Sequence, residues 1–218
     1  MGKFEVVIII PAFNESETIL NVVSNLGGMG DLLIIDDCSQ DNTTQILEQN
    51  NINFLRHDKN LGYEEALASG IKYAKARGYK FLVTTDADGE LSHEAIPKIL
   101  DLLKSGSFLV VGQRNKKNRF IEIIFGMLSY RIFGVKDPLC GMKGYNLSLF
   151  DQYKDFDTKK MIGTEILAYC LRDQIKVTQT PIRVYKRNDE SRFGGSLSSF
   201  FRISRTMLLF FRIVFLKN

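Results

Sequence analysis

The chain has 218 residues, of which 44% are hydrophobic, and this size suits one α/β domain with a full-sized core. Its three cysteines and two histidines are too scattered for a disulfide scaffold or a zinc site, which favours free thiols in a reducing, cytoplasmic compartment. The net charge of +4 is uneven, because residues 1–111 carry 9 basic and 16 acidic side chains while residues 112–218 carry 20 and 9. An acidic half can hold a cation, and a basic half can meet a polyanionic partner.

Strand and helix patterns alternate along the first half of the chain. Residues 4–10 form a β-branched apolar run typical of a buried parallel strand, and a helix is expected from Ser16 until the glycines at 27–30. The same reasoning predicts strands at 32–35, 53–56, 81–85 and 108–112, and helices after the turn at 39–43, at 62–76 and at 95–104. This alternation predicts an α/β fold with a mostly parallel central sheet flanked by helices.

Polar side chains follow several of the predicted strands at the points where those strands end. The pairs are Asn14 and Glu15, Asp36 and Asp37, Asp86 and Asp88, and Gln113 and Arg114. Because parallel strands present their carboxyl ends to the ligand, these loops should meet on one edge of the sheet. A single site at this edge explains the pattern better than acids scattered over surface loops.

Asp86 and Asp88 stand one residue apart after an apolar run. Alternate residues of an extended chain point to the same side, so Asp86, Asp88 and Glu90 can converge on one ion. A hard cation such as Mg2+ or Mn2+ takes a few carboxylate oxygens and completes its shell with substrate phosphates and water. The sequence therefore predicts a metal site at these three residues, and the alternative is a polar turn after a strand.

Five segments in register resemble family 2 glycosyltransferases, whose GT-A fold binds nucleotide-diphospho-sugars. They are residues 9–15 (IIPAFNE), 34–43 (IIDDCSQDNT), 60–66 (NLGYEEA), 86–90 (DADGE) and 112–114 (GQR). Within the family, residues 137–145 (DPLCGMKGY) and 192–196 (RFGGS) resemble most the dolichol-phosphate mannose synthase and polyprenol-phosphate glycosyltransferase branch. Leu197 departs from that branch, which commonly has a lysine there. A dinucleotide-binding Rossmann enzyme is disfavoured, because no Gly-x-Gly-x-x-Gly follows the first strand.

The resemblance implies a nucleoside pocket. Pro11, Phe13 and Glu15 would line it, with the ring of Phe13 as an apolar wall and Glu15 hydrogen-bonded to the ribose. Asp37 would accept a hydrogen bond from a ring N–H of uracil or guanine, and Asp36 would support that loop. The alternatives are that Asp36 only caps a turn and that Glu15 only supports the start of the next helix.

The resemblance also implies an inverting single displacement at the anomeric carbon, with the metal stabilising the leaving nucleoside diphosphate. Asp88 would be the principal metal ligand, Arg114 would neutralise phosphate, and Glu165 is the candidate general base for a sugar hydroxyl. A lipid phosphate is already an anion and needs no base. In that case Glu165 would bond backbone or pair with an arginine, because a buried carboxylate needs a partner. Arg131 and Arg192 are further candidates for contact with the acceptor or with phosphate.

A basic cluster at 114–119 is followed by an expected apolar helix at 120–133. Residues 200–216 again combine basic and apolar side chains in an expected helix. On a helical wheel Arg202, Arg205 and Arg212 share a face opposite an apolar face. Arg212 splits the apolar stretch, so this helix is expected to lie in a membrane interface rather than to span the bilayer. The alternative is a helix packed on the domain core or on the second subunit of a homodimer.

These features divide the chain into a GT-A domain at 1–196, with a nucleotide-sugar half at 1–111 and an acceptor half at 112–196, and a basic amphipathic helix at 197–218. The favoured function is metal-dependent transfer of a sugar from a UDP- or GDP-sugar to a polyprenyl or dolichyl phosphate, by an enzyme attached peripherally to the cytoplasmic face of the membrane. One alternative acceptor is a saccharide hydroxyl in polysaccharide or glycoprotein assembly, and another alternative is a nucleotide-sugar-binding subunit without turnover. Nucleic acid is a disfavoured partner, because the basic half interleaves aliphatic rather than stacking aromatic residues.

Overall fold

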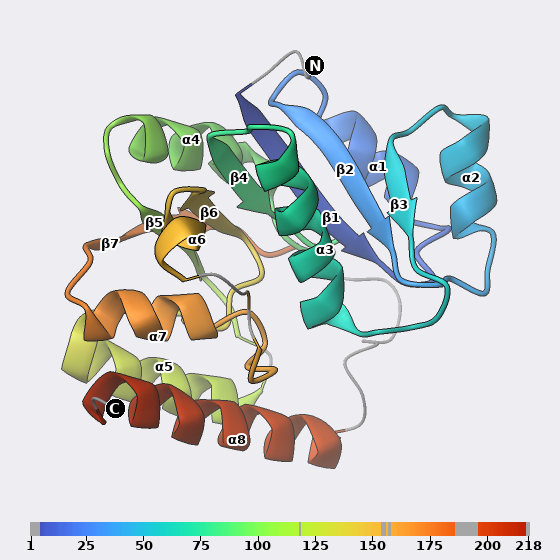
Figure 1. Ribbon diagram of the computed structural model, residues 1–218. Helices are drawn as coiled ribbons and strands as arrows, with labels where there is room; N and C mark the ends of the chain where they lie inside the picture. The colour runs from blue at the N-terminus through green and yellow to red at the C-terminus, as the bar shows by residue number, and fades with distance from the viewer. Residues whose placement is uncertain (1–4, 118, 154–155, 157, 186–195, 217–218) are drawn as a thin grey trace.

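The computed structural model describes residues 5–117, 119–153, 156, 158–185 and 196–216 (Figure 1). Its centre is a seven-stranded sheet in the order β3-β2-β1-β4-β6-β5-β7. Paired strands are parallel except where β6 lies antiparallel between β4 and β5. The strands are β1 (Val6–Ala12), β2 (Asp31–Asp36), β3 (Phe54–Arg56), β4 (Phe81–Thr84), β5 (Leu109–Arg114), β6 (Lys143–Asn146) and β7 (Val177–Ile182).

The alternation of side chains along β1 explains why helices cover both faces of the sheet. Val6, Ile8 and Ile10 belong to one buried cluster, and Val7 and Ile9 belong to a second cluster on the opposite face. The first face is covered by α1 (Ile19–Asn25), α2 (Thr43–Gln49) and α4 (Ile96–Lys104), which follows the short 3₁₀ turn η1 (His93–Ala95). The second face carries α3 (Tyr63–Ala76), α5 (Phe120–Phe133), α6 (Leu149–Gln152), α7 (Glu165–Arg172) and α8 (Ser196–Phe215).

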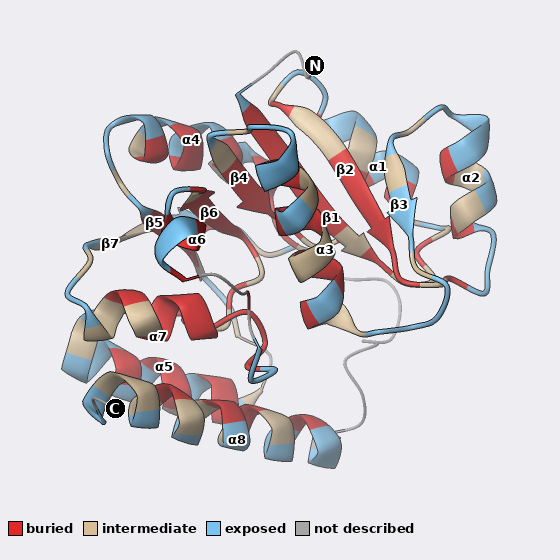
Figure 2. Ribbon diagram, viewed as in Figure 1, coloured by how far each residue is buried: buried red, intermediate tan, exposed pale blue. Residues whose placement is uncertain are grey.

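Helix α8 packs beside α5 and α7 (Figure 2). Its buried stripe consists of Ser199, Ile203, Thr206 and Phe210, at the i, i+4, i+7 and i+11 spacing of one helix face. The ring of Phe210 meets that of Phe125 edge to face, with the ring centroids 5.2 Å apart. The helix therefore packs on the domain core, through a stripe that lies between the predicted basic and apolar faces.

The outer surface of α8 keeps the apolar face that the helical wheel predicts. Phe200, Leu208 and Phe215 are exposed there. None of the helices in the described part of the chain is both long enough and apolar enough to cross a bilayer.

Two strands depart from the predicted element list. The polar tetrapeptide of β6 carries no strand pattern, yet it forms antiparallel pairs with both β4 and β5. Strand β7 contains Pro181 and lies at the edge of the sheet, where a missing N–H costs no ladder bond. The expected division at residue 111 falls inside β5, so both halves of the chain contribute strands to one sheet.

Candidate active site

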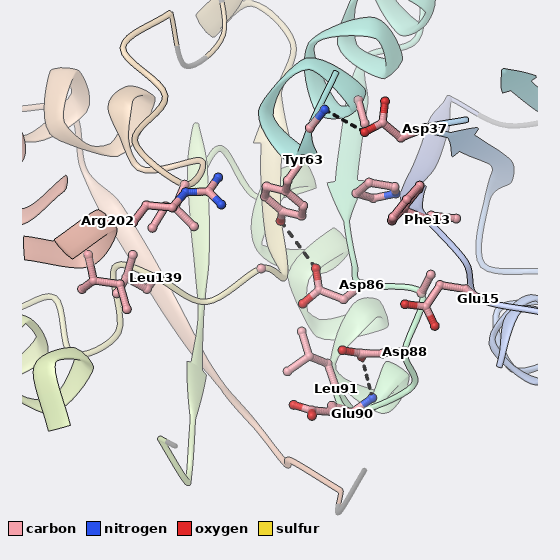
Figure 3. Close-up of a pocket in the computed structure, with 18 of the residues that line it drawn as sticks. Phe13, Glu15, Asp37, Tyr63, Asp86, Asp88, Glu90, Leu91, Leu139 and Arg202 are labelled. Carbon is pink, nitrogen blue, oxygen red and sulfur yellow. Dashed lines mark hydrogen bonds between the residues drawn. The ribbon is translucent and has the colours of Figure 1, made fainter. Parts of the chain in front are cut away.

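A pocket of about 670 Å³ opens at the carboxyl ends of β1, β2 and β4. The structure brings the predicted edge residues Glu15, Asp37, Asp86 and Arg114 into this one cavity, although three come from separate loops and Arg114 comes from the end of β5. Figure 3 shows Phe13, Glu15 and Asp37 on one side of the pocket and Leu139 and Arg202 on the other. Its full lining is Pro11, Ala12, Phe13, Glu15, Asp37, Asn60, Gly62, Tyr63, Ala66, Asp86, Ala87, Asp88, Glu90, Leu91, Arg114, Arg119, Glu122, Leu139, Gly141, Ile162, Arg202 and Ile203.

The loop after β1 is fixed by hydrogen bonds to the loop after β2. The N–H of Asn14 donates to Ser39 Oγ at 3.0 Å, and the N–H of Glu15 donates to Thr43 Oγ1 at 2.8 Å. The carboxylate of Glu15 accepts from the Thr18 hydroxyl at 2.8 Å, so it supports the turn before α1 while it also lines the pocket. Both functions expected for Glu15 are therefore compatible with its position.

Asp37 is held by three donors from another part of the chain. Its carboxylate accepts the N–H groups of Leu61 and Gly62 at 2.8 and 2.7 Å, and His57 Nδ1 lies 2.7 Å from Oδ1. The far ring nitrogen of His57 lies 2.9 Å from the Ser69 hydroxyl of α3. This chain of contacts fixes the orientation of a carboxylate at the predicted nucleoside end of the pocket.

Asp36 lies behind the wall of the pocket. It is fully buried, and its carboxylate accepts from the N–H of Ser39 at 2.9 Å and from the hydroxyl of Thr44 at 2.5 Å. Arg56 approaches the same carboxylate at 3.6 Å. These contacts hold the loop that carries Asp37, and Asp36 itself does not line the cavity.

Asp86 and Asp88 both face the pocket from the loop after β4 (Figure 3). Burial raises the pKa of Asp86 well above its ordinary range, and the neighbouring Asp88 carboxylate raises it further. Asp88 Oδ1 accepts the N–H of Glu90 at 3.0 Å, and the Tyr63 hydroxyl makes a long contact of 3.5 Å with Asp86. Two like charges facing one cavity favour a bound cation, because a cation removes their repulsion.

The chemistry of this acidic pair fits a divalent ion. A Cβ at Gly141 would collide with the Asp86 carboxylate, so the glycine leaves that carboxylate its space. Asp86 and Asp88 would hold the ion, and diphosphate oxygens and water would fill its other positions. No group of three or more His, Cys, Asp or Glu side chains within the described residues is arranged to hold a metal, so the predicted set that includes Glu90 is not assembled here.

Arg114 lines the pocket within an ion-pair network. Its Nε and Nη2 donate to the two oxygens of Asp137 at 2.8 and 3.0 Å, and Nη2 also donates to Glu122 at 3.0 Å. Arg119 donates to the second oxygen of Glu122 at 3.0 Å. Hydrogen bonds and charge from Asp137 outweigh burial and raise the pKa of Arg114, so this guanidinium stays charged. The two acids offset the positive charge that was predicted to act on phosphate.

Among the described residues, the predicted site residues Glu165 and Arg131 lie outside the pocket lining, as Asp36 does. Glu165 is buried outside the pocket lining, where it accepts from Lys159 Nζ and from the Tyr169 hydroxyl, each at 2.7 Å. Burial acts to raise the pKa of Glu165, but the hydrogen bonds from Lys159 and Tyr169 outweigh it and hold the pKa below its ordinary value. Arg131 is exposed on α5 and does not line the pocket, and Arg192 lies outside the described residues. The general base predicted at Glu165 is therefore not placed to reach a substrate in this cavity.

Several lining residues escaped the sequence analysis as site candidates. Tyr63 and Gly141 stand in segments that carry the family resemblance, so their neighbours gave a signal for them. Arg119 ends the basic cluster, and Glu122 stands in the apolar helix that follows it. The sequence pattern argued against a site role for Arg202, because the helical wheel places it on the basic face of a helix expected at the membrane interface. In the structure it reaches the pocket from α8.

Comparison with known proteins decides the family. Residues 7–187 match the profile of glycosyl transferase family 2. The chain belongs to this family. This protein is 27% identical to a UDP-N-acetylglucosamine–dolichyl-phosphate N-acetylglucosaminyltransferase from Methanococcus voltae. The match covers 96% of this chain and 95% of that protein.

Solved structures support the same fold for this family 2 glycosyltransferase. One is glucosyl-3-phosphoglycerate synthase from Mycobacterium tuberculosis with Mn2+ and UDP-glucose, at a TM-score of 0.75, 19% identity, and 98% and 80% coverage of the two chains. Another is the mannosyltransferase PcManGT from Pyrobaculum calidifontis with GDP-mannose and Mn2+, at a TM-score of 0.69, 14% identity, and 95% and 63% coverage. The predicted GT-A fold is confirmed, and the chain is a glycosyltransferase of family 2.

Proposed function

We propose that this glycosyltransferase moves a sugar from a UDP- or GDP-sugar to a polyprenyl or dolichyl phosphate, with inversion at the anomeric carbon. The observation that carries the proposal is the position of Glu165, whose carboxylate is bound by Lys159 and Tyr169 outside the pocket. A hydroxyl acceptor needs a base to remove its proton, whereas an ionised phosphate attacks without one. The Methanococcus voltae relative is a dolichyl-phosphate N-acetylglucosaminyltransferase, and this supports the same acceptor class.

The donor would bind with its nucleoside against Phe13, Glu15 and Asp37. Asp37 would accept a ring N–H of the base, and its orientation is fixed in advance by Leu61, Gly62 and His57. Preorganised polar groups of this kind contribute binding without further ordering of the protein.

Asp86 and Asp88 would hold Mg2+ or Mn2+ on the diphosphate. When bound, such an ion supplies positive charge that stabilises the leaving nucleoside diphosphate. Arg114 and Arg119 also line the pocket, where their guanidinium groups would face phosphate oxygens. The Glu122 carboxylate that joins these two arginines keeps them at fixed positions.

The outer surfaces of α5 and α8 would bring the enzyme to its lipid substrate. Both helices expose large apolar side chains next to arginines, which suits peripheral contact with an anionic leaflet. On α8, Phe201 and Leu208 are each 69% exposed, and Arg212 is exposed beside them. On this proposal the protein works at the cytoplasmic face of the membrane.

The test is transfer of radiolabelled sugar from a panel of UDP- and GDP-sugars, with and without a polyprenyl phosphate. We expect transfer that requires both the lipid phosphate and Mg2+ or Mn2+, and that is lost in Asp88→Ala. Transfer to a soluble saccharide in the absence of lipid would instead support the hydroxyl acceptor. Binding of nucleotide-sugar without transfer to any acceptor would support a subunit without turnover.

A further inference from the structure

Arg202 reaches the candidate active site from the C-terminal helix. It lines the pocket together with Ile203, the next residue of α8. Figure 3 shows it across the cavity from Asp86, on the side of Leu139 and away from Phe13. It therefore lies opposite the nucleoside end, where a second substrate or the outer phosphate of the donor would approach.

The guanidinium of Arg202 forms an ion pair with a buried carboxylate of α3. Its Nη2 lies 2.5 Å from Glu64 Oε1, and the side chain of Glu64 is 6% exposed while that of Arg202 is 38% exposed. The same Glu64 oxygen also accepts the N–H of Ile162 at 3.3 Å. Glu64 thus joins α3, the loop around Ile162 and α8 at the rim of the pocket.

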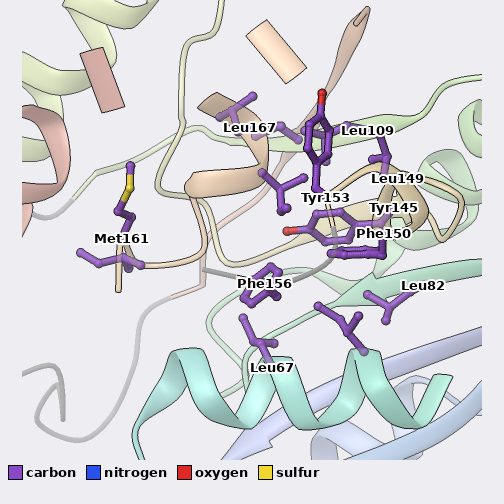
Figure 4. Close-up of a cluster of buried hydrophobic side chains, with 14 of the residues drawn as sticks. Leu67, Leu82, Leu109, Tyr145, Leu149, Phe150, Tyr153, Phe156, Met161 and Leu167 are labelled. Carbon is purple, nitrogen blue, oxygen red and sulfur yellow. The ribbon is translucent and has the colours of Figure 1, made fainter. Parts of the chain in front are cut away.

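The loop at Ile162 is conformationally unusual. Ile162 lines the pocket and has a φ of 56°, a value that β-branched residues rarely adopt. Phe156 lies between Leu67 of α3 and the ring of Tyr145 (Figure 4), with the ring centroids of Phe156 and Tyr145 6.4 Å apart. A Cβ at Gly163, next to Ile162, would lie 3.7 Å from the Phe156 ring, so the loop packs on this part of the core. Local strain held by surrounding structure is a frequent property of ligand-binding loops.

Arg114 and Arg202 contact their carboxylates with different geometry. Arg114 is 16% exposed and binds both oxygens of Asp137. Arg202 is more exposed and meets Glu64 through one carboxylate oxygen in the contact described above. A phosphate offers two oxygens to a guanidinium, so it can replace a one-oxygen carboxylate contact with a two-oxygen contact. Glu64 would keep its hydrogen bond from Ile162 after such an exchange.

We propose that Arg202 is a phosphate-binding residue of this site, and that Glu64 competes with the substrate phosphate for it. The inference rests on the proposed function in one respect, which is that both substrates carry phosphate. The phosphate belongs either to the lipid acceptor or to the nucleotide donor. In the absence of ligand, Glu64 holds Arg202 against the pocket wall, and ligand binding exchanges one anion for another.

The test compares ligand affinity in three variants of the full chain by calorimetry. The ligands are UDP and GDP in the presence of Mn2+, and farnesyl phosphate as a short prenyl phosphate. Arg202→Gln should weaken binding of the responding ligand by about ten-fold or more, because a charge-assisted contact is lost. Glu64→Gln should tighten it, since glutamine can still accept from the N–H of Ile162 but no longer competes as a charge. Arg205→Gln is the matched control, because Arg205 donates to the carbonyls of Lys159 and Lys160 outside the pocket lining.

Opposite changes in the two variants support the proposal, and the ligand that responds identifies the source of the phosphate. If Arg202→Gln and Glu64→Gln lower affinity in parallel, or if neither ligand's affinity changes in either variant, the ion pair is only a structural tie and the proposal is overturned. Thermal unfolding of the same variants monitors folding. Failure of the proposed function would appear separately, as absence of sugar transfer by the unaltered protein, since these binding measurements require no turnover.

Discussion

His57 Nδ1 lies 2.7 Å from the Oδ1 atom of Asp37, and this contact orients a carboxylate in the pocket from a residue outside its lining. Because an ionised carboxylate only accepts, the Nδ1 proton points to Asp37. In the neutral imidazole, Nε2 then accepts from the Ser69 hydroxyl 2.9 Å away. The imidazole therefore connects the loop after β2 to helix α3. From this position His57 supports the Asp37 carboxylate at the predicted nucleoside end of the site.

Replacement of His57 should weaken nucleotide binding, although His57 does not itself line the pocket. His57→Ala should lower the affinity for UDP or GDP by about 1–3 kcal/mol, because the Asp37 carboxylate loses a fixed donor. Ser69→Ala leaves the contact between His57 and Asp37 in place and should have a smaller effect. Calorimetry is the measurement, and unchanged affinity in His57→Ala together with reduced affinity in Asp37→Ala would refute the supporting role.

Metal dependence should follow the aspartate pair. Asp88→Ala should abolish transfer while the protein stays folded, and EDTA should inhibit the unaltered enzyme until Mn2+ is restored. Both expectations follow from the need to neutralise charge on the leaving diphosphate. Circular dichroism of the variant serves as the folding control. Full activity in excess chelator would show that the aspartates do not act through a metal.

Gly141→Ala should damage the metal site through steric contact alone. The new Cβ would press on the Asp86 carboxylate, and the added crowding should cost about 1–3 kcal/mol of unfolding free energy together with Mn2+ affinity. Gly27→Ala is the matched control, because its Cβ would approach nothing closer than the Ser24 carbonyl oxygen at 3.4 Å. Urea unfolding and electron paramagnetic resonance of bound Mn2+ are the measurements. Equal Mn2+ affinity in the two variants would contradict the assigned contact.

Glu165 should matter for stability and not for chemistry. Glu165→Gln should retain sugar transfer to a lipid phosphate but lower the free energy of unfolding at neutral pH by about 1–3 kcal/mol, because its hydrogen bonds to Lys159 and Tyr169 lose a charge. The pKa of Glu165 is below its ordinary value in the folded protein, so its stabilisation is present above the unfolded pKa of about 4.3 and is lost as pH falls through the folded value. Urea titrations at neutral and acidic pH should show the difference between variant and parent shrink in acid. Loss of transfer in a folded Glu165→Gln protein would restore it as a catalytic candidate.

Membrane contact should depend on the exposed side of α8. Phe201→Ser and Leu208→Ser should each weaken binding to anionic vesicles by about 1–2 kcal/mol if these side chains enter the lipid interface. Arg212→Gln should weaken binding to anionic vesicles by about 1 kcal/mol. It should also make that binding less sensitive to salt and to the fraction of anionic lipid. Deletion of α8 is a poor test, since Ile203 and Phe210 are buried in the core. Vesicle sedimentation in which all three variants match the parent would argue against this surface.

The sequence by itself determined strands β1 to β5 of the sheet and the position of its reactive edge. Apolar runs such as the one ending in Ala12 have the period and length of buried strands, and strand ends are marked by polar residues such as Asp37 and Asp86. These are local signals, because periodicity and turn chemistry act over a few residues. They are sufficient to predict that the aspartates meet in one pocket.

Only the tertiary structure decided which charged groups pair with one another. Arg202 follows the helical spacing of an outward basic face, yet it meets Glu64, 138 positions away in the sequence, at the rim of the pocket. Glu165 is the candidate general base for a hydroxyl acceptor by family resemblance, but Lys159 and Tyr169 hold it outside the pocket lining. A helical wheel gives angles around one axis and contains no information on what packs against each face. The contacts of a long-range ion pair depend on how the helices dock, and that is a property of the whole fold.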